Sequence, residues 1–218
     1  MRKVLVSFAI AAVLLAPAAQ SLAVSVPVDL GTWSVVQYDH AGGQPNANWV
    51  LSSGNTVADQ TVNADASILL SDFDIAGTAL DGSWRVHTTS DDDFMGFVFG
   101  YQNRGSYYLF DWKQSDQNDG TYGFAERGMS VKVIHTGAAD PTGPQLWQSS
   151  PPPAAVTVLR HNTIPWADNT DYQFHLSFFP GIFNIQVNRG ATLLQSWNVV
   201  DGTYGDGKFG FYNFSQSP

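Results

Sequence analysis

The stretch TTSDDDFMGFVFGYQNRGSYYLFDWKQ, residues 88–114, decides the fold class of this chain. It sets three adjacent aspartates against two runs of aromatic and aliphatic residues. In the first run, Phe94–Tyr101, both alternating faces are apolar and one carries glycines, which predicts a central strand covered on both sides and closely approached by another backbone. The second run ends in Asp111 and Lys113 on one face, which indicates that this end opens onto solvent or a groove.

The same kind of run recurs along the chain after the N-terminus, and no segment sustains a helical apolar period. Turn residues separate the runs at the spacing of an antiparallel sandwich or barrel. The predicted strands are Trp33–Tyr38, Trp49–Leu51, Thr56–Thr61, Ser67–Ile75, Gly82–His87, Phe94–Tyr101, Ser106–Gln114, Met129–His135, Val156–Arg160, Asp171–Phe178, Ile182–Arg189, Ala191–Asn198 and Gly207–Phe214. The Pro-rich segment Thr136–Pro153 is predicted to be a surface loop.

The N-terminus predicts export. Two basic residues, a short apolar run and the small residues near Ala23 form a signal peptide over residues 1–23, followed by one mature domain over residues 24–218. Loss of Arg2 and Lys3 would leave 8 Lys+Arg against 19 Asp+Glu and lower the formal charge from -9 to -11. This charge disfavours nucleic acid and anionic membranes as partners, and no second apolar stretch is long enough to span a membrane.

The chain has no cysteine, which excludes disulfides, thiol nucleophiles and thiolate metal sites. Eighteen of the 19 acidic residues are aspartate, and Glu126 is the one glutamate. Aspartate favours turns and is the usual oxygen donor of loop-borne calcium sites, so the composition points to cations before catalysis. The five histidines lack the spacing of zinc ligands.

Several motifs, in one order, carry a resemblance to a known family, the C-terminal domain of thrombospondins. It extends over about Asn48 to Gln216. Its pieces are Asn48-Trp49-Val50, Gln60-Thr61-Val62-Asn63, Asp74 with Gly77-Thr78, the run from Asp91 to Gln102, Trp112-Lys113-Gln114, Val131-Lys132-Val133, Leu146-Trp147, Trp166 with Asp168, Thr170 and Tyr172, Thr203-Tyr204, Gly207, Gly210 and Phe214-Ser215-Gln216.

The resemblance implies an all-β, jelly-roll or concanavalin-like sandwich of two antiparallel sheets. It implies a secreted or cell-surface calcium-binding adhesion module whose loops meet an extracellular protein or glycan. The chain departs from the family in having Ala64 at a common cysteine position and in lacking the aspartate-rich repeats that normally precede the domain. The family's sandwich also continues past Phe-Ser-Gln with one more strand, so the resemblance implies that the domain is truncated before its last strand.

The candidate metal ligands are Asp91, Asp92 and Asp93. Crowded carboxylates are tolerable where a cation or hydrogen-bond donors neutralise them, and a calcium ion takes six to eight oxygens. Asp72 and Asp74 alternate on one strand face and are expected to supply further oxygens; the resemblance supports Asp74 and the triplet. The alternative is a solvated acidic turn that protects a sheet edge.

Catalysis is not expected. A glycosidase on this fold needs two carboxyls flanking the bond, and the sequence offers only the pair Asp72 and Asp74 and an isolated Glu126. A calcium-dependent lectin remains the first alternative to an adhesion module. Trp147 and Trp166 lie near Pro-rich loops and are the candidate ligand-binding residues, with packing beneath those loops as the other interpretation.

Overall fold

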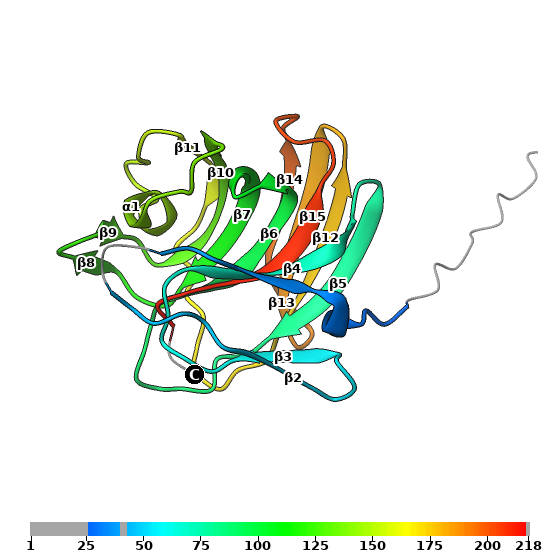
Figure 1. The fold of residues 1–218 in the computed structure, drawn as a ribbon, viewed down its shortest axis with the longest axis horizontal. Helices are drawn as coiled ribbons and strands as arrows, with labels where there is room; N and C mark the ends of the chain where they lie inside the picture. The colour runs from blue at the N-terminus through cyan, green and yellow to red at the C-terminus, as the bar shows by residue number, and fades with distance from the viewer. Residues whose placement is uncertain (1–25, 40–42, 217–218) are drawn as a thin grey trace, which may run out of the picture.

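The computed structural model describes residues 26–39 and 43–216, which fold into a sandwich of two antiparallel sheets (Figure 1). The arrangement confirms the all-β sandwich predicted from the sequence. The predicted signal peptide, residues 1–23, lies outside the described residues. No helix among the described residues is long and apolar enough to cross a membrane.

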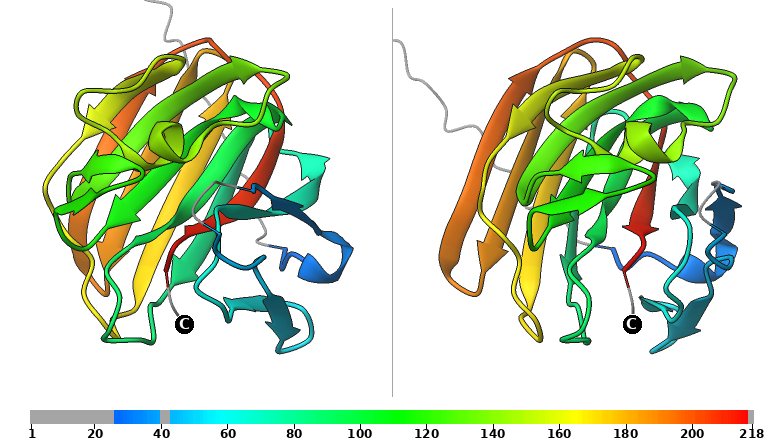
Figure 2. Two further views of the ribbon diagram at one scale, coloured as in Figure 1. Left: turned by 60° about the vertical axis from the view of Figure 1, so that its left-hand side comes forward. Right: turned by 90° about the vertical axis from the view of Figure 1, so that its left-hand side faces the viewer.

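The larger sheet has seven strands and the smaller has four. In spatial order, the larger sheet consists of β1 (Ser34–Gln37), β4 (Ser67–Asp74), β15 (Lys208–Phe214), β6 (Phe94–Asn103), β7 (Gly105–Lys113), β10 (Gly128–Gly137) and β11 (Val156–His161). The smaller sheet consists of β14 (Thr192–Val200), β13 (Ile182–Arg189), β12 (Tyr172–Phe179) and β5 (Thr78–Trp84). Figure 2 shows the smaller sheet packed face to face against the larger.

The main core fills the space between the sheets. Strict alternation on β12 and β13 turns one apolar side chain in every two inward, so each strand buries one face and exposes the other. Phe97 of β6 stacks on Phe110 of β7 with ring centroids 4.8 Å apart, and lies 4.9 Å from Phe174 of β12. These rings connect the two sheets across the centre of the sandwich.

A second apolar cluster covers the opposite face of β6, β7 and β10. It is roofed by the short helix α1 (Gly143–Trp147) and by the hairpin of β8 (Gln117–Asp119) and β9 (Gly123–Ala125). As predicted, Phe94–Tyr101 is buried on both faces. The expectation that Asp111 and Lys113 open onto solvent or a groove is wrong, because this roof leaves them 2% and 0% exposed.

The hairpin of β2 (Trp49–Ser52) and β3 (Val57–Gln60) forms a separate two-stranded sheet beside the sandwich (Figure 2). Polar contacts attach it: the Trp49 indole donates to Ser67 Oγ at 3.2 Å, and the Gln60 amide donates to Asn213 Oδ1 at 3.0 Å. The N-terminal turn η1 (Leu30–Thr32) joins it through the Leu30 amide, which donates to the Asn55 carbonyl at 2.8 Å.

Gly96 explains why two central strands pack so closely. A Cβ placed there would lie 2.0 Å from the carbonyl oxygen of Phe110, which is backbone and has no room to move. The predicted close backbone approach at the glycines of this strand is therefore present at Gly96.

We predict that Gly96→Ala lowers the free energy of unfolding by about 3 kcal/mol, because the methyl group forces the β6–β7 ladder apart. Gly120→Ala is the matched control, since an added Cβ there meets nothing within 4 Å. Urea denaturation of both variants checks this. Equal stability of the two would contradict the close approach.

Candidate metal centre

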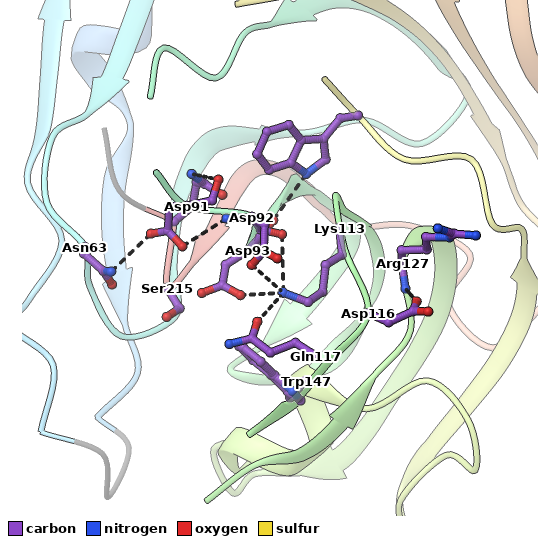
Figure 3. A network of polar contacts seen from close by, with 12 residues as sticks. Asn63, Asp91, Asp92, Asp93, Lys113, Asp116, Gln117, Arg127, Trp147 and Ser215 are labelled. Carbon is purple, nitrogen blue, oxygen red and sulfur yellow. Dashed lines mark hydrogen bonds and ion pairs between the residues drawn. The ribbon is translucent and has the colours of Figure 1, made fainter. Parts of the chain in front are cut away.

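The aspartate triplet lies on the connection from β5 to β6, directly before the first residue of β6 in the middle of the larger sheet. One carboxylate oxygen from each of Asp91, Asp92 and Asp93 lies within 4.8 Å of the others. Figure 3 shows Asp92 and Asp93 beside Lys113, and Asp91 turned toward Asn63. The structure therefore brings together the three candidate ligands that are adjacent in the sequence, in an all-oxygen set of the kind that hard cations prefer.

Lys113 is the cationic partner of the triplet. Its ammonium lies 2.5 Å from Asp93 Oδ1 and 3.5 Å from Asp92 Oδ1, and it also donates to Gln117 Oε1 at 2.7 Å. The Lys113 side chain is fully buried. Its ammonium lies 4.8 Å from the ring centroid of Trp147, so it is held from the side opposite the aspartates by an aromatic face.

Asp93 is the buried member of the triplet. It is 4% exposed, and its carbonyl accepts a hydrogen bond from the Trp166 indole at 3.3 Å. Burial raises the pKa of the Asp93 carboxyl to about 6, and the Lys113 ammonium, which lowers the pKa, offsets only part of that effect. Asp93 therefore pairs with Lys113 in the protein interior.

Asp91 and Asp92 are half-buried and lie nearer the solvent. Asp91 Oδ2 accepts from the side-chain amide of Asn63 at 3.2 Å, and its carbonyl accepts from the amide of Gln216 at 3.5 Å. The Asp92 carbonyl accepts from the Gln114 backbone at 3.1 Å. These contacts join the triplet to the segments that follow β3, β15 and β7.

Asn63 is a neighbour that reasoning from the sequence did not identify as a site residue, although it belongs to the Gln60–Asn63 motif. Its amide donates to Asp91. Rotation of the amide by 180° exchanges nitrogen for oxygen and would turn a donor to Asp91 into a further oxygen ligand. Asp91, Asp92 and Asn63 are thus the residues that could hold a hard cation.

The structure does not bring Asp72 and Asp74 to the triplet. The antiparallel register pairs Asn213 with Ser67 and Lys208 with Asp74, and the triplet directly precedes β6 at the Asn213 end of β15. Asp74 therefore stands at the opposite end of β4, about 20 Å along the strand. One ion cannot bind carboxylates that far apart, so Asp72 and Asp74 do not supply the further oxygens expected for an ion at the triplet.

Asp74 has a different role. Its Oδ1 accepts from the Ala76 amide at 2.7 Å and its Oδ2 from the Gly207 amide at 2.8 Å, which ties two turns together. Asp72, two residues before it, is exposed. Because both Asp74 oxygens accept backbone hydrogen bonds, this pair is poorly suited to glycosidic bond cleavage.

Trp147 and Trp166 were the candidate ligand-binding residues, and the structure buries both, at 2% and 1% exposure. Trp147 packs against Phe94 and Phe214, and its indole donates to the Gly123 carbonyl at 3.1 Å. Trp166 belongs to the core between the sheets. These contacts contradict a sugar-stacking surface at either residue and agree with the alternative, packing beneath the loops.

Comparisons with known proteins agree with this architecture. The family model described as thrombospondin C-terminal region matches residues 44–218. Human thrombospondin-2 is 33% identical over 202 residues, which cover 86% of this chain and 17% of that protein. Bovine cartilage oligomeric matrix protein is 30% identical over 203 residues, which cover 86% of this chain and 26% of that protein. The chain thus spans about a fifth of the length of these relatives.

A carbohydrate-binding module of Bacillus subtilis has a similar structure. Its TM-score is 0.55 at 13% sequence identity, and the similarity covers 84% of this chain and 88% of that chain. At this level of identity the likeness concerns the fold alone.

We predict that Lys113→Met lowers the free energy of unfolding by about 3–5 kcal/mol in EDTA, because the buried Asp93 carboxylate loses its partner. The double variant Asp93→Asn with Lys113→Met should regain most of that loss, since a buried ion pair can be replaced by uncharged groups at little cost. Guanidinium denaturation of Lys113→Met, Asp93→Asn and the double variant, each compared with the unchanged protein, gives the coupling energy. Additive losses would contradict a coupled ion pair.

The pH dependence of the same carboxyl can be measured directly. The native Asp93 binds a proton near pH 6 and the unfolded one near pH 4, so its contribution to stability falls as the pH rises from about 4 to 6. Carboxyl carbon NMR in EDTA should give an Asp93 midpoint of about 6. A midpoint below about 4 would show that Lys113 outweighs the burial.

Proposed function

Because the chain belongs to the thrombospondin C-terminal family, we propose that it is an exported, calcium-binding interaction module without catalytic activity. Its place of action would be the extracellular space or the cell surface, and its partner an extracellular protein or glycan. The observation that supports a cation most directly is the clustering of three carboxylate oxygens within 4.8 Å. Calcium is the ion of choice because this donor set consists of carboxylates on a loop.

The charge balance of the triplet favours a divalent ion. The Lys113 ammonium lies 2.5 Å from Asp93 Oδ1 and 3.5 Å from Asp92 Oδ1, so its single positive charge is shared within a triplet of three carboxylates. A divalent cation on the solvent side would offset the other two charges. Asp91 and Asp92, with the amide of Asn63 and water, would supply the oxygens, while Asp93 would keep its pair with Lys113.

Such an ion would act structurally. The Asp91 contacts with Asn63 and Gln216 already connect segments that follow β3 and β15 to the segment that precedes β6. Binding there would lock three chain segments, distant in sequence, at one end of the sandwich. A surface presented by these loops would then have a fixed shape, which lowers the entropic cost of binding a partner.

A glycan is the second candidate partner. The outer face of the smaller sheet carries three amide side chains in neighbouring positions: Gln173 lies opposite Asn188, and Gln186, two residues before Asn188, lies opposite the His175 imidazole. Amides offer donors and acceptors to sugar hydroxyls, and the structurally similar bacterial protein is a carbohydrate-binding module. A glycan array at saturating calcium separates the candidates: glycan binding lost on Gln186→Ala favours a lectin, and silence across sugars favours a protein partner.

We predict that 10 mM calcium raises the melting temperature of the protein by about 5–10 °C. This follows from about 2.7 kcal/mol of stabilisation at a hundredfold excess over the dissociation constant, and about 2–4 °C per kcal/mol for a domain of this size. Asp91→Asn and Asp92→Asn should each remove most of the shift. Asp93→Asn is less informative, because it also leaves Lys113 without its buried partner.

Asp72→Asn is the matched control, because Asp72 is an exposed aspartate at the far end of β4. It should keep the full calcium shift. Differential scanning fluorimetry of the four proteins with calcium and with EDTA makes the comparison. An unchanged melting temperature in calcium, or a shift that every variant retains, would show that the triplet is only a solvated acidic turn.

A further inference from the structure

The outer face of the smaller sheet is built almost entirely from uncharged polar side chains. Along its strands, every second residue points away from the core. The antiparallel registers set these residues side by side in rows, because directly opposite residues share a face. The polar members, which we call the amide face, are Asp81, Ser83, Gln173, His175, Ser177, Asn184, Gln186, Asn188, Ser196 and Asn198.

Charge is nearly absent from the amide face, although the chain has a formal net charge of -9. Its one carboxylate, Asp81, lies 2.8 Å from His175 Nδ1. At the border of the face, Arg85 pairs with Asp171 at 3.2 Å, and Arg189 stands at the turn that ends β13. Charged side chains are normally the ones found on a solvated surface. A surface that carries amides and hydroxyls in their place is complementary to an uncharged ligand.

The amides of this face have hydrogen-bonding groups to spare. Asn184 Nδ2 donates to Asn198 Oδ1 at 3.0 Å, which leaves the Asn184 oxygen and the Asn198 nitrogen for a ligand. The side chains of Gln173, Gln186 and Asn188 make no hydrogen bond within residues 26–39 and 43–216. Each of these amides offers two donors and an acceptor. Neighbouring sugar hydroxyls, which both donate and accept, match such a row.

A row of apolar side chains closes one end of the amide face. Phe179 lies opposite Ile182, and Ile182 lies opposite Val200, so the three side chains are neighbours on β12, β13 and β14. Their exposed fractions are 47%, 47% and 82%. Exposed apolar groups that are bordered by polar ones mark interaction sites. The row provides an exposed aromatic ring directly beside the amides.

The apolar row lies far from Gln216 and from the aspartate triplet. The Gly77 amide donates to the Phe178 carbonyl at 2.8 Å, which places the row beside the turn from β4 to β5. That turn follows Asp74, which pairs with Lys208 at the start of β15, whereas Gln216 follows the end of β15. The row and the triplet therefore occupy opposite ends of the sandwich.

We propose that the amide face binds an uncharged polysaccharide. The C–H face of a sugar ring would pack on Phe179 and Ile182, and its hydroxyls would meet the amides of the next rows. The face extends for about 20 Å along β12, from Phe179 to Gln173, so it accommodates several sugar units. This inference rests on the glycan alternative of the proposed function, since it names the class of glycan, and it does not depend on the calcium site.

Acidic polysaccharides do not fit the same surface. The amide face has no lysine or arginine to pair with a sugar carboxylate or sulfate, and Arg85 at its border is already paired with Asp171. The net negative charge of the chain repels a polyanion, most strongly at low salt. The charge of the glycan is therefore the property that the face selects.

Electrophoresis in gels that contain a dissolved polysaccharide tests the class of ligand. The uncharged probes are xyloglucan, galactomannan and dextran, and the acidic ones are polygalacturonate and hyaluronan. We expect at least one uncharged polymer to retard the whole mature chain, in calcium and in EDTA alike, and the acidic polymers to leave its mobility unchanged. Retardation by acidic polymers alone would keep a lectin but overturn this proposal, as would no retardation by any polymer.

Two pairs of variants locate the site. Phe179→Ala should weaken binding at least about tenfold, because the sugar loses its aromatic support. Phe124→Ala is the matched control, since Phe124 is 44% exposed on β9, away from the smaller sheet. Gln186→Ala should weaken binding several-fold, whereas Asn118→Ala, which removes an exposed amide from β8, should not. Equal retardation of the Phe179→Ala and Phe124→Ala proteins would overturn the proposal.

Other outcomes remain distinguishable from failure of the calcium site. Self-association that Phe179→Ala abolishes, with no retardation by any polymer, would assign the face to a second copy and contradict a glycan. A protein that shows the full calcium shift but binds no uncharged polymer contradicts this proposal alone. Retardation of Asp91→Asn to the same extent as the unchanged protein supports it, because the two sites lie at opposite ends of the sandwich.

Discussion

The burial of one ammonium group, that of Lys113, constrains the region around the triplet. Lys113 ends β7 on the outer face of the larger sheet, where α1 and the β8–β9 hairpin seal it from water. An isolated buried charge is too costly to keep, so the fold must supply a carboxylate, and Asp93 does so at 2.5 Å. The second buried pair on this face, Lys132 with Asp111 at 2.7 Å, meets the same requirement.

Once Asp93 is held inside, its two neighbours have little freedom. Asp91 and Asp92 precede Asp93 just before the start of β6, and their side chains lie nearer the solvent. One ammonium offsets only part of the repulsion among three carboxylates. The repulsion is tolerated because the adjacent strand, β6, is buried along Phe94–Tyr101 and cannot shift to separate the charges. A site with two outward carboxylates on a rigid base is the arrangement that a divalent cation would stabilise.

Several features could be predicted from the sequence because they depend on local pattern. Alternation revealed most strands, apolar residues on both faces revealed the buried strand Phe94–Tyr101, and adjacency alone kept the triplet together. Register and covering layers are not local. The spacing of Asp72 and Asp74 does not tell which end of the sheet they reach. The sequence predicts a strand at Gly82–His87, whereas β5 is Thr78–Trp84, because the exposed first half of β5 has only a weak apolar pattern. That half forms a strand through its pairing with β12. Burial of Lys113 and Trp147 depends on the short covering elements α1, β8 and β9, whose three to five residues are too few to show a period. Trp166 is buried in the core between the sheets, which depends on how the two sheets pack.

The central claim is that Lys113 leaves the triplet incompletely neutralised, so that a calcium ion binds on its solvent side. A long-wavelength anomalous difference map from crystals grown in calcium tests this most directly. The account predicts a peak within about 2.6 Å of carboxylate oxygens of both Asp91 and Asp92, with the Asp93–Lys113 pair intact beneath it. A map without a peak at the triplet, in crystals that contain calcium, would contradict the claim and leave Lys113 as the cation of this site.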